Sequence, residues 1–133
     1  MPLLKLPNNF FKGMKQLTEV YLPAKLQEIG DYALYSTGIT SITIPEDVYS
    51  LGEYAFSYNN LKSIILESKT LSSTSFLGAD PFYNTRGSIT SVIITQLTSI
   101  PSAMLRETSI VDIELPPSVE EIGSHAFHAC YDL

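Results

Sequence analysis

The residue types best suited to metal binding gather near the C-terminus, where His125, His128 and Cys130 lie close together. Imidazole nitrogens and a thiolate are ligands that Zn²⁺ accepts in proteins. The equivalent positions elsewhere in this chain, however, are filled by residues that bind no metal. We therefore expect no metal site and no cofactor, and we interpret Cys130 as an ordinary buried thiol.

Two pairs of adjacent carboxylates, Glu46-Asp47 and Glu120-Glu121, are the candidates for acid–base chemistry. Neighbouring side chains usually point apart, and no histidine or lysine is placed to complete such a site. The sequence also lacks a glycine-rich phosphate loop, a G-x-S-x-G elbow and a C-x-x-C pair. It predicts no catalytic residue, so an enzyme is the least favoured class.

The composition restricts further the kinds of protein and partner that fit this chain. A chain of 133 residues with 44% hydrophobic residues is long enough for one globular domain, and its single cysteine allows no internal disulfide. The net charge of −6 argues against a nucleic-acid partner. The apolar runs are too short to cross a bilayer, so we expect no direct membrane insertion.

A repeated sequence unit positions the candidate side chains named above. Segments of the form Leu/Ile-x-x-Ile/Val-x-Leu/Ile start at residues 17, 39, 61, 89 and 110, which gives spacings of 22, 22, 28 and 21 residues. Such a period is typical of solenoids, in which each unit buries its apolar face against neighbouring copies. We expect residues 1–133 to form one repeat domain with partial units at both ends.

Each alternating segment predicts a β-strand. Its first, fourth and sixth positions should face the core, and its second, third and fifth positions should face solvent. Stacking of the copies predicts a β-rich α/β solenoid: a right-handed superhelix with one parallel sheet of about five strands. Pro23, Pro45 and Pro116 follow three segments and mark strand ends, because proline has no N–H to donate.

The second half of each unit follows the pattern Ile/Leu-Gly-x-x-Ala-Phe/Leu, as in residues 51–56 and 122–127. The glycines predict either a positive φ or a close backbone approach; they are Gly30, Gly52, Gly78 and Gly123. A buried apolar column should run opposite the sheet through Leu34, Phe56, Phe82, Leu105 and Phe127. The segments around it are short and predict single helical or 3₁₀ turns.

The same register explains the histidines. His125 falls where Tyr32 and Tyr54 fall, on outer turns, and Cys130 falls in the interior slot that Met14 fills in an earlier unit. The third unit is longer than the others, and its extra residues should form loops at 67–75 and 84–88.

The outward positions of the strands are the candidate binding surface. Ile65 and Ile93 should lie side by side and could anchor a protein partner in a field of serine and threonine. The alternative is a solvated face on which β-branched residues merely favour strands. The full candidate set is Tyr21, Thr43, Lys62, Ile65, Ile93 and Glu114.

With these columns aligned, the chain resembles the BspA-like leucine-rich repeat family, whose unit reads roughly L-x-x-I-x-I-P-x-x-V-x-x-I-G-x-x-A-F-x-x-C-x-x-L. Residues 110–133 match this unit with one added residue at Pro116-Pro117. The resemblance implies a large bacterial or protist surface protein, without shared catalytic residues, that adheres to host or cell-surface proteins. It therefore implies an extracellular or cell-surface location. A structural spacer that binds nothing itself is the alternative function.

The ends of the array form a further expectation. Stacked repeats need polar caps, yet Phe10 and Phe11 at one end and Phe127 and Leu133 at the other are apolar. We therefore expect the chain to be a fragment of a longer solenoid, whose ends in isolation associate with one another or fray.

Overall fold

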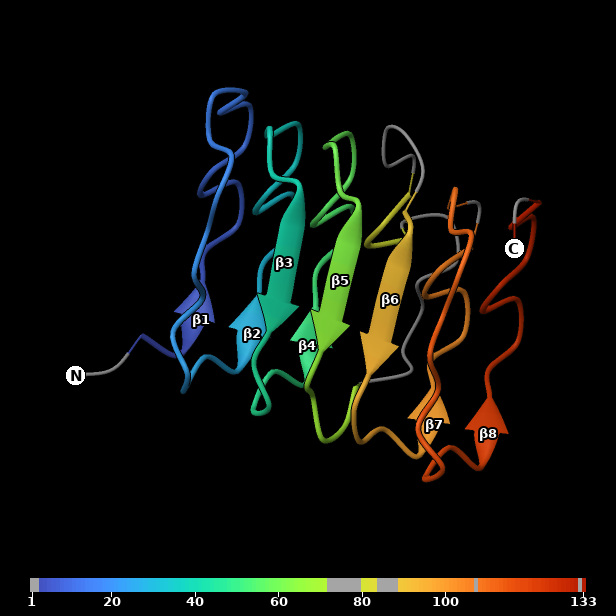
Figure 1. Ribbon diagram of the computed structural model, residues 1–133. Coiled ribbons are helices and arrows are strands. Elements are labelled where there is room, and N and C mark those ends of the chain that lie inside the picture. Colours follow the sequence, from blue (N-terminus) through green and yellow to red (C-terminus); the bar gives the residue numbers. More distant parts are fainter. Residues whose placement is uncertain (1–2, 72–79, 84–88, 107, 132) are drawn as a thin grey trace.

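The backbone winds through successive coils that stack side by side along one axis (Figure 1). The computed structural model describes residues 3–71, 80–83, 89–106, 108–131 and 133. The strands of the described residues are β1 (Lys5–Leu6), β2 (Glu28–Ile29), β3 (Ser41–Ile44), β4 (Ser50–Leu51), β5 (Ser63–Leu66), β6 (Ser91–Ile94), β7 (Ser99–Ile100) and β8 (Glu121–Ile122). The expectation of a β-rich leucine-rich-repeat solenoid with parallel strands is confirmed.

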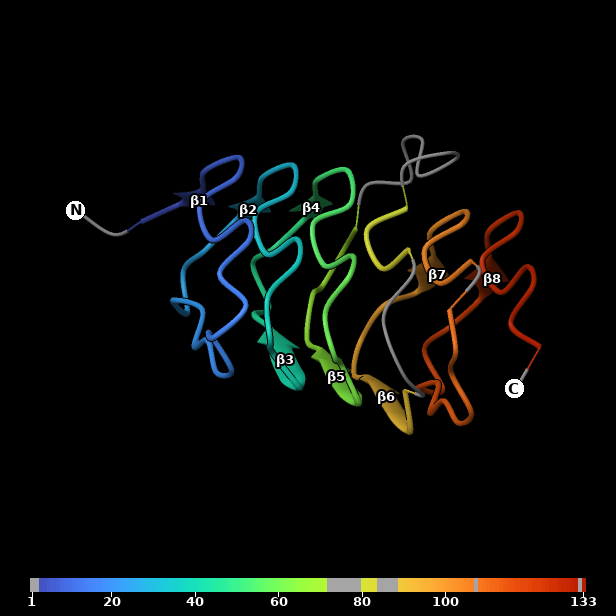
Figure 2. The same cartoon turned by 90° about the horizontal axis from the view of Figure 1, so that it is seen from above.

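The strands form two rows on opposite sides of the coil stack (Figure 2). One row holds the parallel sheet β3-β5-β6, and the other holds the parallel sheets β1-β2-β4 and β7-β8. The expected single sheet of five strands is therefore replaced by three ladders. The second row uses the apolar residue before the glycine of each coil, such as Ile29 and Leu51, which are buried and were not predicted as strand residues.

The central sheet has the predicted register. Ser41, Ser63 and Ser91 lie opposite one another, as do Ile44, Leu66 and Ile94. Side chains alternate along each strand, so that the fourth and sixth positions of the repeat are buried.

Two predicted strands are wrong or incomplete. Residues 17–22 form no strand: Gly38 N–H donates to the Leu17 carbonyl at 2.9 Å, and the segment then leaves the ladder. This segment ends the row, so it has a neighbouring coil on one side only. Residues 110–115 contact the preceding coil through two isolated bridges: Ile110 pairs with Ile89, which precedes β6, and Glu114 pairs with Ile93 of β6.

The glycine column marks close contact between coils, not positive φ. A Cβ on Gly52 would lie 2.4 Å from the backbone nitrogen of Asp31, and one on Gly123 would lie 2.4 Å from that of Ser102. Both distances are well below van der Waals contact, so any larger residue would push the coils apart. Gly78 lies outside the described residues.

The predicted helical or 3₁₀ turns are wrong. Residues 31–36 form successive hydrogen-bonded turns in which Tyr32 and Ser36 have φ of 56°, and Tyr54 and Tyr58 repeat this geometry with 52° and 57°. A right-handed helix cannot contain such residues.

Backbone hydrogen bonds between neighbouring coils explain why these segments form tight turns and not helical turns. Tyr32, Leu34 and Ser36 donate their N–H groups to carbonyls of the next coil at 2.8–2.9 Å. A helix would direct those same groups along its own axis and leave the neighbouring carbonyls without these donors.

The buried column opposite the central sheet is confirmed. Leu34, Phe56, Phe82 and Leu105 are 0–1% exposed, and Phe127 at the end of the array is partly buried. The rings of Phe56 and Phe82 stack with centroids 5.0 Å apart and an interplanar angle of 10°. Through this contact the buried column continues into the longer third unit. The loops predicted for that unit lie mainly outside the described residues.

Both ends of the array expose apolar side chains. Phe10 and Met14 are 53% and 52% exposed in the first coil, and Ile122 and Leu133 are 54% and 53% exposed in the last. Met14 therefore does not fill an interior slot as predicted, because no coil covers it within the described residues.

We predict that Phe56→Ala lowers the free energy of unfolding by about 3–5 kcal/mol, because it opens a cavity beside the Phe82 ring. Urea denaturation followed by circular dichroism measures the change. Tyr21→Ala is the control: its side chain is 88% exposed, so the expected loss is within about 0.5 kcal/mol. A loss below about 1 kcal/mol for Phe56→Ala would show that this column does not hold the coils together.

Candidate functional site

The outward face of the central sheet brings together four of the six predicted site residues. Thr43, Ile65 and Ile93 occupy the same register position in β3, β5 and β6, and Glu114 is bridged to Ile93 in the next coil. Ile65 is 36% exposed and Ile93 is half-buried. The face thus offers an apolar pair between a threonine and a carboxylate.

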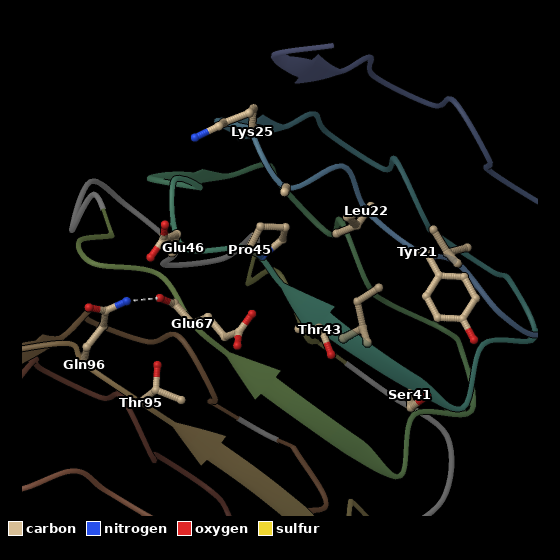
Figure 3. Close-up of a pocket in the computed structure, with 13 residues that line it drawn as sticks. Tyr21, Leu22, Lys25, Ser41, Thr43, Pro45, Glu46, Glu67, Thr95 and Gln96 are labelled. Atoms are coloured by element: carbon tan, nitrogen blue, oxygen red, sulfur yellow. Dashed lines mark hydrogen bonds between the residues drawn. The ribbon is translucent and has the colours of Figure 1, made fainter. Parts of the chain in front are cut away.

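A hollow of about 690 Å³ adjoins this face where residues 20–25 run beside β3 (Figure 3). It exists because residues 17–22 leave the ladder, so the space next to β3 is not filled by a paired strand. Two predicted site residues, Tyr21 and Thr43, line it. The full lining is Val20, Tyr21, Leu22, Ala24, Lys25, Ser41, Ile42, Thr43, Pro45, Glu46, Glu67, Thr95 and Gln96.

The walls of the hollow carry both charges. Lys25 comes from the first coil, and Glu46 and Glu67 come from the two coils that follow (Figure 3). Gln96 donates from Nε2 to the Glu67 carbonyl at 2.7 Å, and the Thr95 hydroxyl lies 3.4 Å from the Leu66 carbonyl. Such a lining of hydroxyls, an amide and both charges can bind the backbone and polar side chains of a protein segment.

Lys62 lies apart from the hollow, at the start of β5. Its carbonyl accepts from Thr90 N–H at 2.8 Å and from the Thr90 hydroxyl at 3.2 Å. Its backbone thus holds two coils together, and its side chain is exposed. Lys62 is not among the residues that line the hollow with Tyr21, whose side chain is 88% exposed.

The histidines and the cysteine do not converge. His125 and His128 form an edge-to-face pair with ring centroids 5.2 Å apart, and Ser124 Oγ lies 2.8 Å from His125 Nδ1. Cys130 Sγ instead contacts the Leu105 carbonyl at 3.0 Å. Within the described residues, no group of three or more potential ligands is arranged to hold a metal ion.

In other coils, the position equivalent to Cys130 is occupied by a residue that donates a hydrogen bond. The sequence analysis missed this feature. Thr37 and Thr108 donate their hydroxyls to the carbonyls of Leu34 and Leu105 at 3.1 and 2.9 Å. Asn59 donates in the same way to Phe56. The recurrence of small polar residues three positions after the buried column was the available signal.

The predicted acidic pairs are solvent-facing. Glu46, Glu120 and Glu121 are exposed, and Asp47 lies 3.5 Å from Lys69 of the next coil. The described part of the chain contains no helix long and apolar enough to cross a bilayer.

A buried ion pair was also missed. Arg106 Nε lies 3.0 Å from Asp80 Oδ2, with side chains 22% and 1% exposed. Asp80 occupies the turn position that holds Tyr32 and Tyr54 in earlier coils. A carboxylate this deeply buried is stabilised by its charged donor, so the pair is a structural link between two coils.

We predict that Arg106→Ala lowers the free energy of unfolding by about 2–3 kcal/mol, because the buried Asp80 loses its charged donor. Lys69→Ala is the matched control, because it removes an ion pair whose side chains are 58% and 31% exposed. That pair should contribute less than about 0.5 kcal/mol. Equal effects of the two substitutions in urea denaturation would contradict a structural role for Arg106.

One sequence family and one solved structure match nearly all of the chain. A sequence family described as the BspA type leucine rich repeat region matches in six copies, over residues 2–96 and 69–133. The crystal structure of a leucine-rich repeat protein from Bacteroides ovatus is similar, with a TM-score of 0.80 and 29% identity over 98% of this chain and 33% of that chain. The chain thus spans about a third of that protein. Among curated proteins, none matches.

Proposed function

Because the chain belongs to the BspA-type leucine-rich repeat family, we propose that it is a non-enzymatic protein-binding module. Its repeats are a scaffold on which outward side chains vary while the buried columns stay fixed. The binding surface is the outward face of β3, β5 and β6 together with the hollow beside β3.

The apolar pair Ile65 and Ile93 carries this proposal. The two side chains share one register position on neighbouring strands, on a face whose other outward residues include Ser63 and Ser91. Apolar side chains at the centre of a polar surface are the usual anchors of protein interfaces. The hollow lined by Tyr21 and Thr43 adds hydrogen-bonding groups at the rim.

The partner that fits such a surface is a folded protein on a host cell or a neighbouring cell. We propose that the module lies outside the cell, as an adhesin-like part of a surface protein. The support for this location is what the resemblance to the BspA-type leucine-rich repeat family implies.

We predict that replacing Ile65 and Ile93 together with aspartate reduces binding to host cells and purified matrix proteins at least tenfold, because both anchors become charged. Flow cytometry and surface plasmon resonance measure the loss. The control pair is Gln16→Asp and Asn60→Asp, which adds the same charge at exposed positions outside β3, β5 and β6. Equal binding by both pairs and the parent would favour a spacer or another binding face.

We also propose that the two ends of the array associate head to tail. The exposed Phe10 and Met14 of one copy would pack against Ile122 and Leu133 of another. Residues 1–25 contain four lysines and one glutamate, whereas residues 107–133 contain six carboxylates and no lysine or arginine. Charge therefore favours contact between unlike ends, a heterologous arrangement that can extend.

We predict that the mass of the parent chain rises with concentration in size-exclusion chromatography with light scattering, and that added salt weakens the association. Phe10→Glu should keep the chain monomeric, because it places a charge in the contact. Tyr49→Glu, which adds the same charge at a 44% exposed position between β3 and β4, should behave like the parent. A parent that remains monomeric at every concentration would overturn the proposal.

A further inference from the structure

Five tyrosines on the outer turns of three neighbouring coils form one connected set of rings. We call Tyr32, Tyr35, Tyr54, Tyr58 and Tyr83 the tyrosine cluster. Ring centroids lie 5.2 Å apart for Tyr32–Tyr35 and Tyr35–Tyr58, 5.5 Å for Tyr32–Tyr54 and 5.8 Å for Tyr54–Tyr83. The rings are half-buried and line a hollow of about 240 Å³.

The turn geometry creates this arrangement. Tyr32 and Tyr54 occupy the same position of successive coils, and both have positive φ. The Tyr32 N–H group donates to the Glu53 carbonyl of the next coil at 2.9 Å. The ring positions are therefore fixed by the stacking of coils, and the hollow is preformed.

A cation of the chain itself already uses part of the cluster. Lys12 Nζ lies 4.7 Å from the centroid of the Tyr32 ring and 5.5 Å from that of Tyr35. Both distances are within the range over which an aromatic ring attracts an ammonium group. One edge of the cluster thus already contacts the ammonium group of a lysine.

The charges near the cluster have the sign that a cation requires. Burial raises the pKa of Tyr54 above its usual value, and the nearby carboxylates of Asp80 and Glu53 raise it further. Glu53 is exposed at the turn beside Tyr54. The whole chain carries a net charge of −6.

We propose that the tyrosine cluster binds a lysine side chain of a partner protein, with the ammonium group seated among the rings. The cluster lies on turns, not on the outward face of β3, β5 and β6, so this site is independent of the sheet-face proposal. Recognition here depends on ring faces and positive charge, not on sequence-specific hydrogen bonds.

The probe is the peptide acetyl-Gly-Lys-Lys-Gly-amide, and its counterpart carries acetylated lysines of similar shape without charge. The chain has eight tyrosines, five of them in the cluster. ¹³C-tyrosine ring resonances, assigned by single substitutions, distinguish the cluster from Tyr21, Tyr49 and Tyr131. The lysine peptide should shift cluster resonances, and the acetylated peptide should not. Equal binding of both peptides would overturn the proposal.

Paired substitutions separate ring chemistry from shape. Tyr35→Leu with Tyr58→Leu should weaken binding of the lysine peptide by about two- to five-fold for each ring lost, whereas Tyr35→Phe with Tyr58→Phe should retain most of it. Thermal unfolding verifies that each pair is folded. Unchanged affinity in a folded leucine pair would contradict the proposal.

A third experiment changes Lys12 and leaves the tyrosine rings unchanged. Lys12→Gln should strengthen peptide binding, because it removes a competing ammonium from Tyr32 and Tyr35. Lys15→Gln changes the net charge equally from a neighbouring exposed position. Equal effects of the two variants would indicate general attraction to an acidic chain and would overturn a specific site.

Discussion

Hydrogen bonding between neighbouring coils is the constraint on which the rest of this structure depends. It acts in the strands, where Ser41, Ser63 and Ser91 share one register, and also in the turns, where Leu34 N–H donates to the Ala55 carbonyl. Nearly every side of a coil therefore pairs with the next coil. The requirement fixes the spacing of backbones, excludes a Cβ at Gly52 and forces several non-glycine residues into positive φ. Each such residue costs about 1–2 kcal/mol, which the bonds between coils must offset.

This constraint explains what could be predicted from the sequence. The alternation in residues 39–44 has one explanation, a strand with one buried face, and repetition revealed which positions are equivalent. The central strands, the column through Phe56 and the adjacency of Ile65 and Ile93 were predicted for that reason and are confirmed. The family assignment followed from the same columns.

The turns could not be predicted in the same way, because pattern alone does not show where N–H groups point. Residues 31–36 are short and apolar in the centre, which suits a helical turn as well as a chain of tight turns. Only the neighbouring coil decides between them. The hollow beside β3 could not be predicted for a related reason. Residues 17–22 have the same alternation as the paired strands, but they lie at the end of their row and form no strand. Asp80 and Arg106 occupy positions that vary from coil to coil, so no column marked them.

The link between Asp80 and Arg106 also bears on how such an array changes over generations. Repeat proteins gain and lose units by duplication and deletion, and interchangeable units tolerate such events. These two coils are not interchangeable: the position of Asp80 is a tyrosine in the two preceding coils, and the position of Arg106 is a histidine in the coil that follows. Deletion of the coil that carries Arg106 would leave the buried Asp80 carboxylate without this charged donor. We therefore expect deletion of this coil to destabilise the array more than deletion of a coil that takes part in no such pair.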